Sequence, residues 1–303
     1  MAEPAARPVL IIGGPTASGK SGLALAAATR LNGVVINADS LQVYRGLPIL
    51  TAQPSDDDYQ AAPHALYAAL EPDDACNAAR WRDLALSEIN AAHAQGQLPI
   101  ITGGTGFYIK TLLEGISPIP DIDPAIRDTL SQKQRELGNP AFHAAFRAVD
   151  PVMAEKLDPF NTQRVIRAWE VLIGTGKSLA EWQALPREQP PAHLRMIVVT
   201  LLPDRERLYK NCNDRFEKML AAGALDEVRG FTHITSPLTH ALGYPELSAY
   251  LSGALSREEA VEQARQSTRH YAKRQMTWFR HQIHTDLTLI APDADAVERL
   301  VKI

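Results

Sequence analysis

The sequence has little of the chemistry that would place it in several large classes of protein. Only two of its 303 residues are cysteine, Cys76 and Cys212, and they are far apart and lack metal-site spacing. Neither a disulfide framework nor a cysteine-held metal is therefore expected. No apolar run approaches the roughly 20 residues needed to cross a bilayer, and the first residues do not resemble a signal peptide. We expect a cytoplasmic monomer that does not bind membranes.

An excess of positive charge is also missing, since 31 Lys and Arg residues face 35 Asp and Glu residues, for a net charge of −4. Such a chain has no general attraction for nucleic acid, so a polyanionic partner needs a local basic patch. The hydrophobic content of 45% and the charged content of 22% are ordinary for a globular protein. The length suits one large or two modest domains.

What the sequence does contain is a phosphate-binding motif near its start. Residues 14–21 follow an apolar run at 9–12 and precede an Ala- and Leu-rich run at 23–31. They match the pattern G-x-x-x-x-G-K-[ST], in which a glycine-rich loop and a helix N-terminus hold phosphate oxygens. The lysine, Lys20, reaches the terminal phosphates, and the hydroxyl of Ser21 is the candidate ligand for Mg²⁺. The candidate diphosphate or nucleotide site is Gly14, Pro15, Thr16, Ala17, Ser18, Gly19, Lys20 and Ser21. A simple glycine-rich turn is the alternative.

Hydrophobic patterns predict strands that alternate with helices. The expected strands are 8–13, 34–36, 98–102 and 196–202, with a weaker candidate at 64–70. The expected helices are 19–31, 77–95, 107–114, 204–222 and 257–284, with a last strand at 287–290 and a closing helix at 293–302. This alternation predicts an α/β fold whose core is a P-loop NTPase-like parallel sheet flanked by helices.

Proline-rich seams at 116–124 and 186–191 enclose a stretch with helical segments and no convincing strand. Because a buried strand returns after the second seam, we predict an all-helical insertion domain at 118–192. The α/β core then consists of 1–117 and 193–303. Two consecutive domains are the alternative.

Two polar stretches follow expected strands, at the edge where parallel sheets carry their chemistry. In the stretch 39–42, Asp39 could be a Mg²⁺ ligand, a general base or a helix N-cap. In the stretch 103–108, Thr105 offers a hydroxyl to phosphate or Mg²⁺, although a tight turn explains the glycines nearly as well. No acid ends the 98–102 strand, which argues against ordinary nucleotide hydrolysis.

Basic side chains are concentrated on the expected helix at 257–284. Arg265, Arg269 and Lys273 form one stripe that Arg280 continues, and aromatic residues are interleaved. No Asp or Glu interrupts residues 265–280, so the face could bind RNA by phosphate contact and base stacking. A solvated basic face is the alternative, and surface ion pairing is the alternative for Arg164, Arg167 and Arg215.

Taken in order, these stretches resemble the tRNA dimethylallyltransferases, the isopentenyl-transferring (IPP transferase) family. The matching pieces are 14–21, 37–40 with 42–44, 103–106 with Tyr108, 126–127, Asn161 with Arg164 and Arg167, 175–176, 243–244 with Glu246, and Arg269 with 271–275 and 277–280. One departure is Asn211-Cys212, where an Arg-Ile pair is expected, and it puts in doubt how the region around Arg215 is supported.

The resemblance implies an enzyme that needs Mg²⁺ and transfers the dimethylallyl group of dimethylallyl diphosphate to N6 of adenosine 37. Its substrates would be tRNAs that read UNN codons, held by the anticodon stem-loop. Asp39, Thr105 and Arg215 are the implied catalytic residues. The implied tRNA-binding residues are Asp39, Ser40, Leu41, Gln42, Thr105, Arg127, Gln163, Arg164, Val165, Ile166, Arg167, His240, Ala241, Leu242, Gly243, Tyr244, Pro245, Lys273, Arg274, Gln275, Met276, Thr277, Trp278, Phe279 and Arg280. The alternative is a P-loop kinase for a small molecule or nucleoside.

Overall fold

The computed structural model describes residues 6–302. The chain forms two compact units, of which the first combines Met1–Leu113 with Pro190–Ile303 and the second is Glu114–Gln189. The second unit therefore begins four residues before the expected 118 and ends three before the expected 192. The reason is that the first and last segments of this unit pair with each other. Ile116 and Glu188 exchange backbone hydrogen bonds, and Arg187 forms an ion pair with Glu114 at 2.7 Å.

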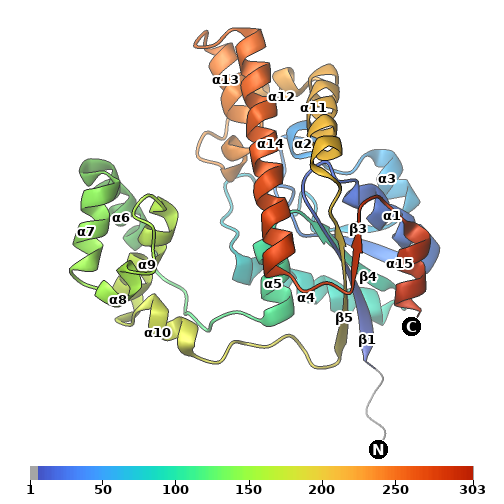
Figure 1. Ribbon diagram of the computed structural model, residues 1–303, viewed down its shortest axis with the longest axis horizontal. Helices are drawn as coiled ribbons and strands as arrows, with labels where there is room; N and C mark the ends of the chain where they lie inside the picture. The colour runs from blue at the N-terminus through green and yellow to red at the C-terminus, as the bar shows by residue number, and fades with distance from the viewer. Residues whose placement is uncertain (1–5, 303) are drawn as a thin grey trace, which may run out of the picture. The chain divides into compact units, whose positions relative to one another are not determined.

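A six-stranded, all-parallel sheet forms the centre of the first unit (Figure 1). Its strands are β1 (Arg7–Gly13), β2 (Gly33–Asn37), β3 (His64–Ala65), β4 (Leu98–Gly103), β5 (Leu194–Leu201) and β6 (Leu287–Leu289). Their order across the sheet is β3-β2-β4-β1-β5-β6. The central strands β1 and β4 pair from Leu10 opposite Ile100 to Gly13 opposite Gly103, so the loops that follow these two strands are neighbours. The predicted α/β fold is confirmed.

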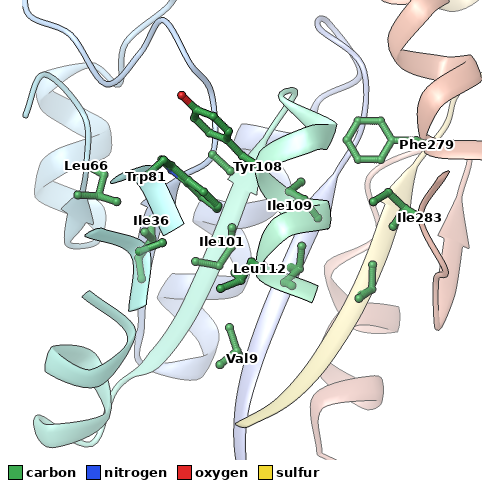
Figure 2. Close-up of a cluster of buried hydrophobic side chains, with 14 of the residues drawn as sticks. Val9, Ile36, Leu66, Trp81, Ile101, Tyr108, Ile109, Leu112, Phe279 and Ile283 are labelled. Carbon is green, nitrogen blue, oxygen red and sulfur yellow. The ribbon is translucent and has the colours of Figure 1, made fainter. Parts of the chain in front are cut away.

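Helices cover both faces of this sheet because its strands are apolar on both sides. Leu10 and Ile12 pack under α1 (Lys20–Leu31) and α15 (Ala294–Val301). Val9 and Ile11 pack on the other side with α4 (Ala78–Ala94), α5 (Gly106–Glu114), α11 (Arg205–Ala221) and α14 (Arg257–Gln282). Figure 2 shows that second core, in which Phe279 of α14 faces α5. Burial of both faces explains why these strands read as continuous apolar runs.

A smaller cluster lies beside the sheet and involves α2 (Pro48–Thr51), α12 (Ala224–Gly230), the 3₁₀ helix η1 (Pro237–His240) and α13 (Tyr244–Leu251). The short helix α3 (Asp56–Ala61) lies against α1 instead. Leu47, Phe216 and Leu238 are central to this cluster and are at most 2% exposed. The cluster fixes one end of α11 and the side of α14.

The predicted strand over 64–70 is wrong beyond its first two residues. Only His64 and Ala65 pair with β2. Leu66 and Ala68 have positive φ angles of 61° and 46°, which an extended strand cannot accommodate. The chain turns there instead, and Leu70 rejoins the fold through a bridge to Tyr44.

The second unit is entirely helical and has its own core. Its helices are α6 (Pro124–Leu137), α7 (Asn139–Arg147), α8 (Pro151–Ala154), α9 (Thr162–Thr175) and α10 (Leu179–Ala184). Phe142 and Phe146 of α7 pack on Trp169 of α9, with ring centroids 5.0 and 5.7 Å apart. In the described part of the chain, none of the helices of either unit is long and apolar enough to span a bilayer.

Candidate functional site

The phosphate loop connects β1 to α1 and is held in a shape that side chains would obstruct. Gly19, directly before α1, has φ of +94°, and Ala17 also has a left-handed φ of 61°. A Cβ atom at Gly14 would lie 2.5 Å from the carbonyl oxygen of Leu201 on β5. No acidic residue lies in the first turn of α1, so its positive end is free to act on an anion.

Two half-buried cations lie at this loop. The Lys20 ammonium donates to the Pro15 carbonyl at 3.2 Å, and the Arg215 guanidinium, from α11, donates to the Thr16 hydroxyl at 2.7 Å. Burial lowers the pKa of Lys20 to about 8, although the nearby Asp39 carboxylate opposes the shift. Burial also lowers the pKa of Arg215, again against Asp39. Two cations thus share one acid, which leaves an excess of positive charge for an anionic ligand.

The loop also contains an unsatisfied polar atom. The Ser18 side chain is 5% exposed, and its hydroxyl has no hydrogen-bond partner among residues 6–302. Buried polar atoms without a partner are uncommon, and a ligand oxygen is one way to supply it. The loop, the two cations and this hydroxyl together fit a polyphosphate.

Asp39 lies at the carboxyl end of β2 and is positioned by Asn37. The Asn37 side-chain oxygen accepts from the Asp39 amide at 2.8 Å, while its nitrogen donates to the carbonyls of Asp39 and Leu66. One Asp39 carboxylate oxygen accepts from the Leu41 amide at 3.0 Å, so the residue forms an Asx turn and caps no helix. The other oxygen makes no hydrogen bond with the described residues. Asn37 is fully buried and was missed as a site residue, although a polar residue ending an apolar strand could have revealed it.

Thr105 supports Asp39 from the neighbouring strand. Its hydroxyl oxygen accepts from the Ser40 amide at 2.9 Å, and its own amide donates to the Ala38 carbonyl at 3.2 Å. The hydroxyl therefore joins the turn after β4 to the turn after β2. The expected contact of Thr105 with diphosphate or Mg²⁺ stays a prediction. Gln42, expected to bind tRNA, donates its side-chain amide to the carbonyls of Thr51 and Ala52 at the end of α2.

The inner face of α14 closes on glycines of the same strand ends. Added Cβ atoms at Gly13 and Gly106 would lie 2.4 Å from Phe279 and 2.1 Å from Trp278. Gln275, Met276 and Phe279, three of the positions expected to bind tRNA, are at most 7% exposed. Met276 and Phe279 pack in the core on the sheet, and the Gln275 amide is hydrogen-bonded to Thr16 and Gly104, so none of the three is available to an RNA at the surface of this structure.

The outer face of α14 is basic, but over a shorter length than the sequence suggested. Arg265 forms an ion pair with Glu217. Arg269 forms an ion pair with Glu262 at 2.8 Å and donates a hydrogen bond to the Asn213 side chain at 2.9 Å. Lys273, Arg274, Thr277 and Arg280 are exposed. A groove of about 480 Å³ follows this face, lined by His270, Lys273, Arg274, Thr277, Trp278, His281 and Gln282. The groove has no acidic lining residue, which suits a polyanion.

In the second unit, Glu170 forms ion pairs with two of the three arginines expected to contact tRNA. Its side chain is 8% exposed and forms ion pairs with Arg127 at 3.0 Å and Arg167 at 3.1 Å. Arg127 also donates to Gln163 at 2.7 Å. Arg164 is exposed and forms no ion pair with the described residues, whereas Val165 and Ile166 lie in the core of this unit.

The segment 240–245 is divided between surface and core. Ala241 is 1% exposed and Tyr244 is 9% exposed, so both pack beside α11. Gly243 has φ of +93°, and a Cβ there would lie 2.6 Å from the Phe216 ring. Leu242 is half-buried, and only His240 and Pro245 are exposed.

The departure at Asn211-Cys212 does not leave Arg215 unsupported. The Asn211 side chain donates to the Ala17 carbonyl of the phosphate loop at 3.1 Å. Cys212 is fully buried in the core, and its burial raises the pKa of the thiol to about 11. Both residues therefore support the loop and the helix from which Arg215 projects.

Few protein oxygens are available for Mg²⁺. Residues 6–302 contain no cluster of three His, Cys, Asp or Glu side chains that could hold a metal. Mg²⁺ commonly keeps several waters and binds through one or two protein groups plus substrate phosphates. The exposed Ser21 in the first turn of α1 fits such a sparse donor set.

Known proteins match this chain over most of its length. The IPP transferase family model matches residues 42–282. A tRNA dimethylallyltransferase from Paramagnetospirillum magneticum is 52% identical over 285 residues, which are 93% of this chain and 90% of that relative. The range matched by the family model includes the turn after β4 and the whole of α14.

Solved structures are similar as well. The tRNA isopentenylpyrophosphate transferase from Bacillus halodurans has a TM-score of 0.65 and 33% identity, over 98% of this chain and 93% of that one. A eukaryotic dimethylallyltransferase acting on tRNA has a TM-score of 0.79 and 26% identity, over 97% of this chain and 78% of that one.

Proposed function

This chain belongs to the IPP transferase family, and on that premise we propose that it is a tRNA dimethylallyltransferase. It transfers the dimethylallyl group of dimethylallyl diphosphate to N6 of adenosine 37 in tRNAs that read UNN codons, and diphosphate is released. The observation that carries the proposal is the grouping of Lys20 and Arg215 at the phosphate loop beside one carboxylate, Asp39.

The leaving group is held by the phosphate loop in this mechanism. As the bond between C1 and the diphosphate oxygen breaks, its electron pair moves onto diphosphate. Lys20 and Arg215, together with the N-terminus of α1, stabilise the negative charge that grows there. The loop chemistry that in other proteins handles nucleotide phosphates here serves a departing group.

Asp39 is the base for the acceptor. The lone pair of N6 forms the new bond to C1, and the proton that N6 loses passes to the carboxylate oxygen of Asp39 that lacks a hydrogen bond. An amine conjugated to a purine is a weak nucleophile, so both its orientation and its deprotonation matter. Asn37 and Thr105 hold the turn that carries Asp39 and thereby orient the base.

The RNA is held by basic surfaces on each unit. The exposed face of α14 carries Lys273, Arg274 and Arg280, and the second unit carries Arg127, Arg164 and Arg167. Arginine and lysine bind phosphate oxygens, and the half-buried Trp278 offers a ring in the groove of α14. The target base leaves its stack to reach Asp39, which is easiest in the single-stranded anticodon loop.

Ser21 would contribute its hydroxyl to a Mg²⁺ ion, and the ion would supply electrophilic stabilisation of the diphosphate. We place the reaction in the cytoplasm, where tRNA and the prenyl donor meet, and propose that a monomer performs it.

The decisive experiment is mass analysis of adenosine 37 after tRNA is incubated with the protein, Mg²⁺ and dimethylallyl diphosphate. We expect a mass gain of one dimethylallyl group that is absent when adenosine 37 is replaced by guanosine. Unmodified tRNA in the presence of folded protein would refute the proposal.

A P-loop kinase would share the loop but has no use for the basic groove on α14. Incubation with γ-labelled ATP and candidate small acceptors distinguishes the two activities. We expect no labelled acceptor, and phosphoryl transfer would favour the kinase.

A further inference from the structure

A buried amide joins the two strand-end loops of the site. Gln275, on the inner face of α14, is 6% exposed. Its side-chain oxygen accepts from the Thr16 amide of the phosphate loop at 2.8 Å, and its side-chain nitrogen donates to the Gly104 carbonyl, also at 2.8 Å. The partners are 259 and 171 residues away in the sequence. One side chain thus connects three distant segments.

The two loops that Gln275 joins carry different parts of the proposed chemistry. Thr16 is the residue whose hydroxyl receives Arg215, so it belongs to the leaving-group side. Gly104 precedes Thr105, and a Cβ built on Gly104 would lie 3.6 Å from the Asp39 carboxylate, so it belongs to the acceptor side. The relative position of these loops sets the distance over which the transferred group must pass.

The fit of the amide is close. A Cβ at Gly104 would lie only 2.3 Å from the Gln275 nitrogen, so the glycine makes room for this contact. Both bonds are buried, where an unmade hydrogen bond costs more than it does at the surface. The Thr16 amide and the Gly104 carbonyl would each lose a partner if an apolar side chain replaced glutamine.

We propose that Gln275 is a positioning residue, which fixes the phosphate loop against the turn that carries Thr105 and so aligns diphosphate with Asp39. The proposal rests on the proposed function and gives Gln275 a task inside the site. The family resemblance had instead implied that Gln275 contacts tRNA.

The test compares Gln275→Met, which keeps length and volume but makes neither bond, with Gln266→Met, the same change at an exposed position of α14. We expect Gln275→Met to speed hydrogen exchange at the Thr16 amide by at least about tenfold. We also expect its KM for dimethylallyl diphosphate to rise about tenfold while the KM for tRNA stays within about twofold. Gln266→Met should match the wild type in all three.

Three outcomes would overturn the proposal in an active wild-type enzyme. Unchanged Thr16 exchange would mean that the bond does not hold the loop. A raised KM for tRNA alone would make Gln275 an RNA contact. A lower melting temperature with both KM values unchanged would leave it a packing role only.

Further controls keep the two proposals separate. If Gln275→Met does not fold, Gln275→Glu retains an acceptor for Thr16, so its Thr16 exchange should stay slow, and fast exchange would contradict the assigned bond. If the wild-type protein modifies no tRNA, the proposed function fails, while the exchange experiment still decides whether Gln275 holds the loop.

Discussion

The Arg215 guanidinium donates a 2.7 Å hydrogen bond to the Thr16 hydroxyl, and this contact links α11 to the phosphate loop across 199 residues. Arg215 thereby lies beside Lys20, although nothing in its own stretch of sequence marks it as a phosphate ligand. Asn211, one helical turn earlier, contacts the same loop at the Ala17 carbonyl. The leaving-group side of the site is thus built by two segments, and its function depends on how they dock.

Removing the Asp39 carboxylate should separate chemistry from binding. Asp39→Ala takes away the proposed base, and we expect prenyl transfer to fall at least about 100-fold. The affinity for tRNA, measured by filter binding, should change little because the basic surfaces remain. Asp57→Ala, at an exposed acid in α3, is the control and should be as active as the wild type. Unchanged turnover in Asp39→Ala would remove the residue from the mechanism.

The half-buried side chain of Lys20 makes diphosphate binding depend on pH. Burial lowers the pKa of Lys20 from 10.5 to about 8, so the side chain is charged below that pH and loses its proton above it. We therefore expect the Kd for dimethylallyl diphosphate, measured by calorimetry, to weaken up to about tenfold per pH unit above pH 8. Lys20→Arg keeps its charge, and its profile should be flat over the same range. A wild-type profile as flat as that of Lys20→Arg would contradict this prediction.

The exposed end of α14 should supply the salt-dependent part of tRNA binding. We expect Lys273→Ala and Arg280→Ala to weaken binding and to reduce the slope of log K against log salt concentration by about 0.7–0.9 each. Arg257→Ala, at the other end of the helix, should leave the slope unchanged. Turnover at saturating tRNA should be preserved in all three, and its loss in Lys273→Ala would instead place that residue in catalysis.

Glu170 should stabilise the second unit by orienting two arginines. Glu170→Ala leaves Arg127 and Arg167 without their shared carboxylate, and both arginines are about 40% exposed. Partial solvation limits the expected loss of stability to about 1–2 kcal/mol, measured by urea unfolding. The KM for tRNA should rise because the guanidinium groups are no longer held in place.

The exposed Glu155 provides the control for that experiment, since its contact with Arg147 spans 3.7 Å between well-exposed side chains. Glu155→Ala should change neither stability nor KM. An equal effect of both substitutions would show that Glu170 has no special role.

Much of the fold could be predicted from the sequence because its signals are local. Apolar runs ending in glycine or in polar residues marked β1, β2 and β4, and helical spacing marked α4 and α14. The strand expected at 64–70 failed because Leu66 and Ala68 adopt positive φ angles, which neither residue type favours and which the sequence therefore does not signal. The burial of Val165, Ile166 and Phe279 could not be predicted from the sequence either, since each has charged residues close by in the chain. Which face of a helix is buried depends on the element that packs against it.

The sequence by itself determined the phosphate loop, the succession of strands and helices along the chain, and the family. Each of these follows from patterns of residues that are close together in the chain. Only the tertiary structure decided which distant side chains meet. It placed Arg215 on Thr16, Thr105 on Ser40, and Gln275 between Thr16 and Gly104. In the folded chain Arg265 and Arg269 form ion pairs with Glu217 and Glu262, so the exposed basic face is confined to the end of α14. The physical reason is that hydrogen bonds and ion pairs depend on distances of a few ångströms, and only the packed fold sets these distances between residues far apart in sequence.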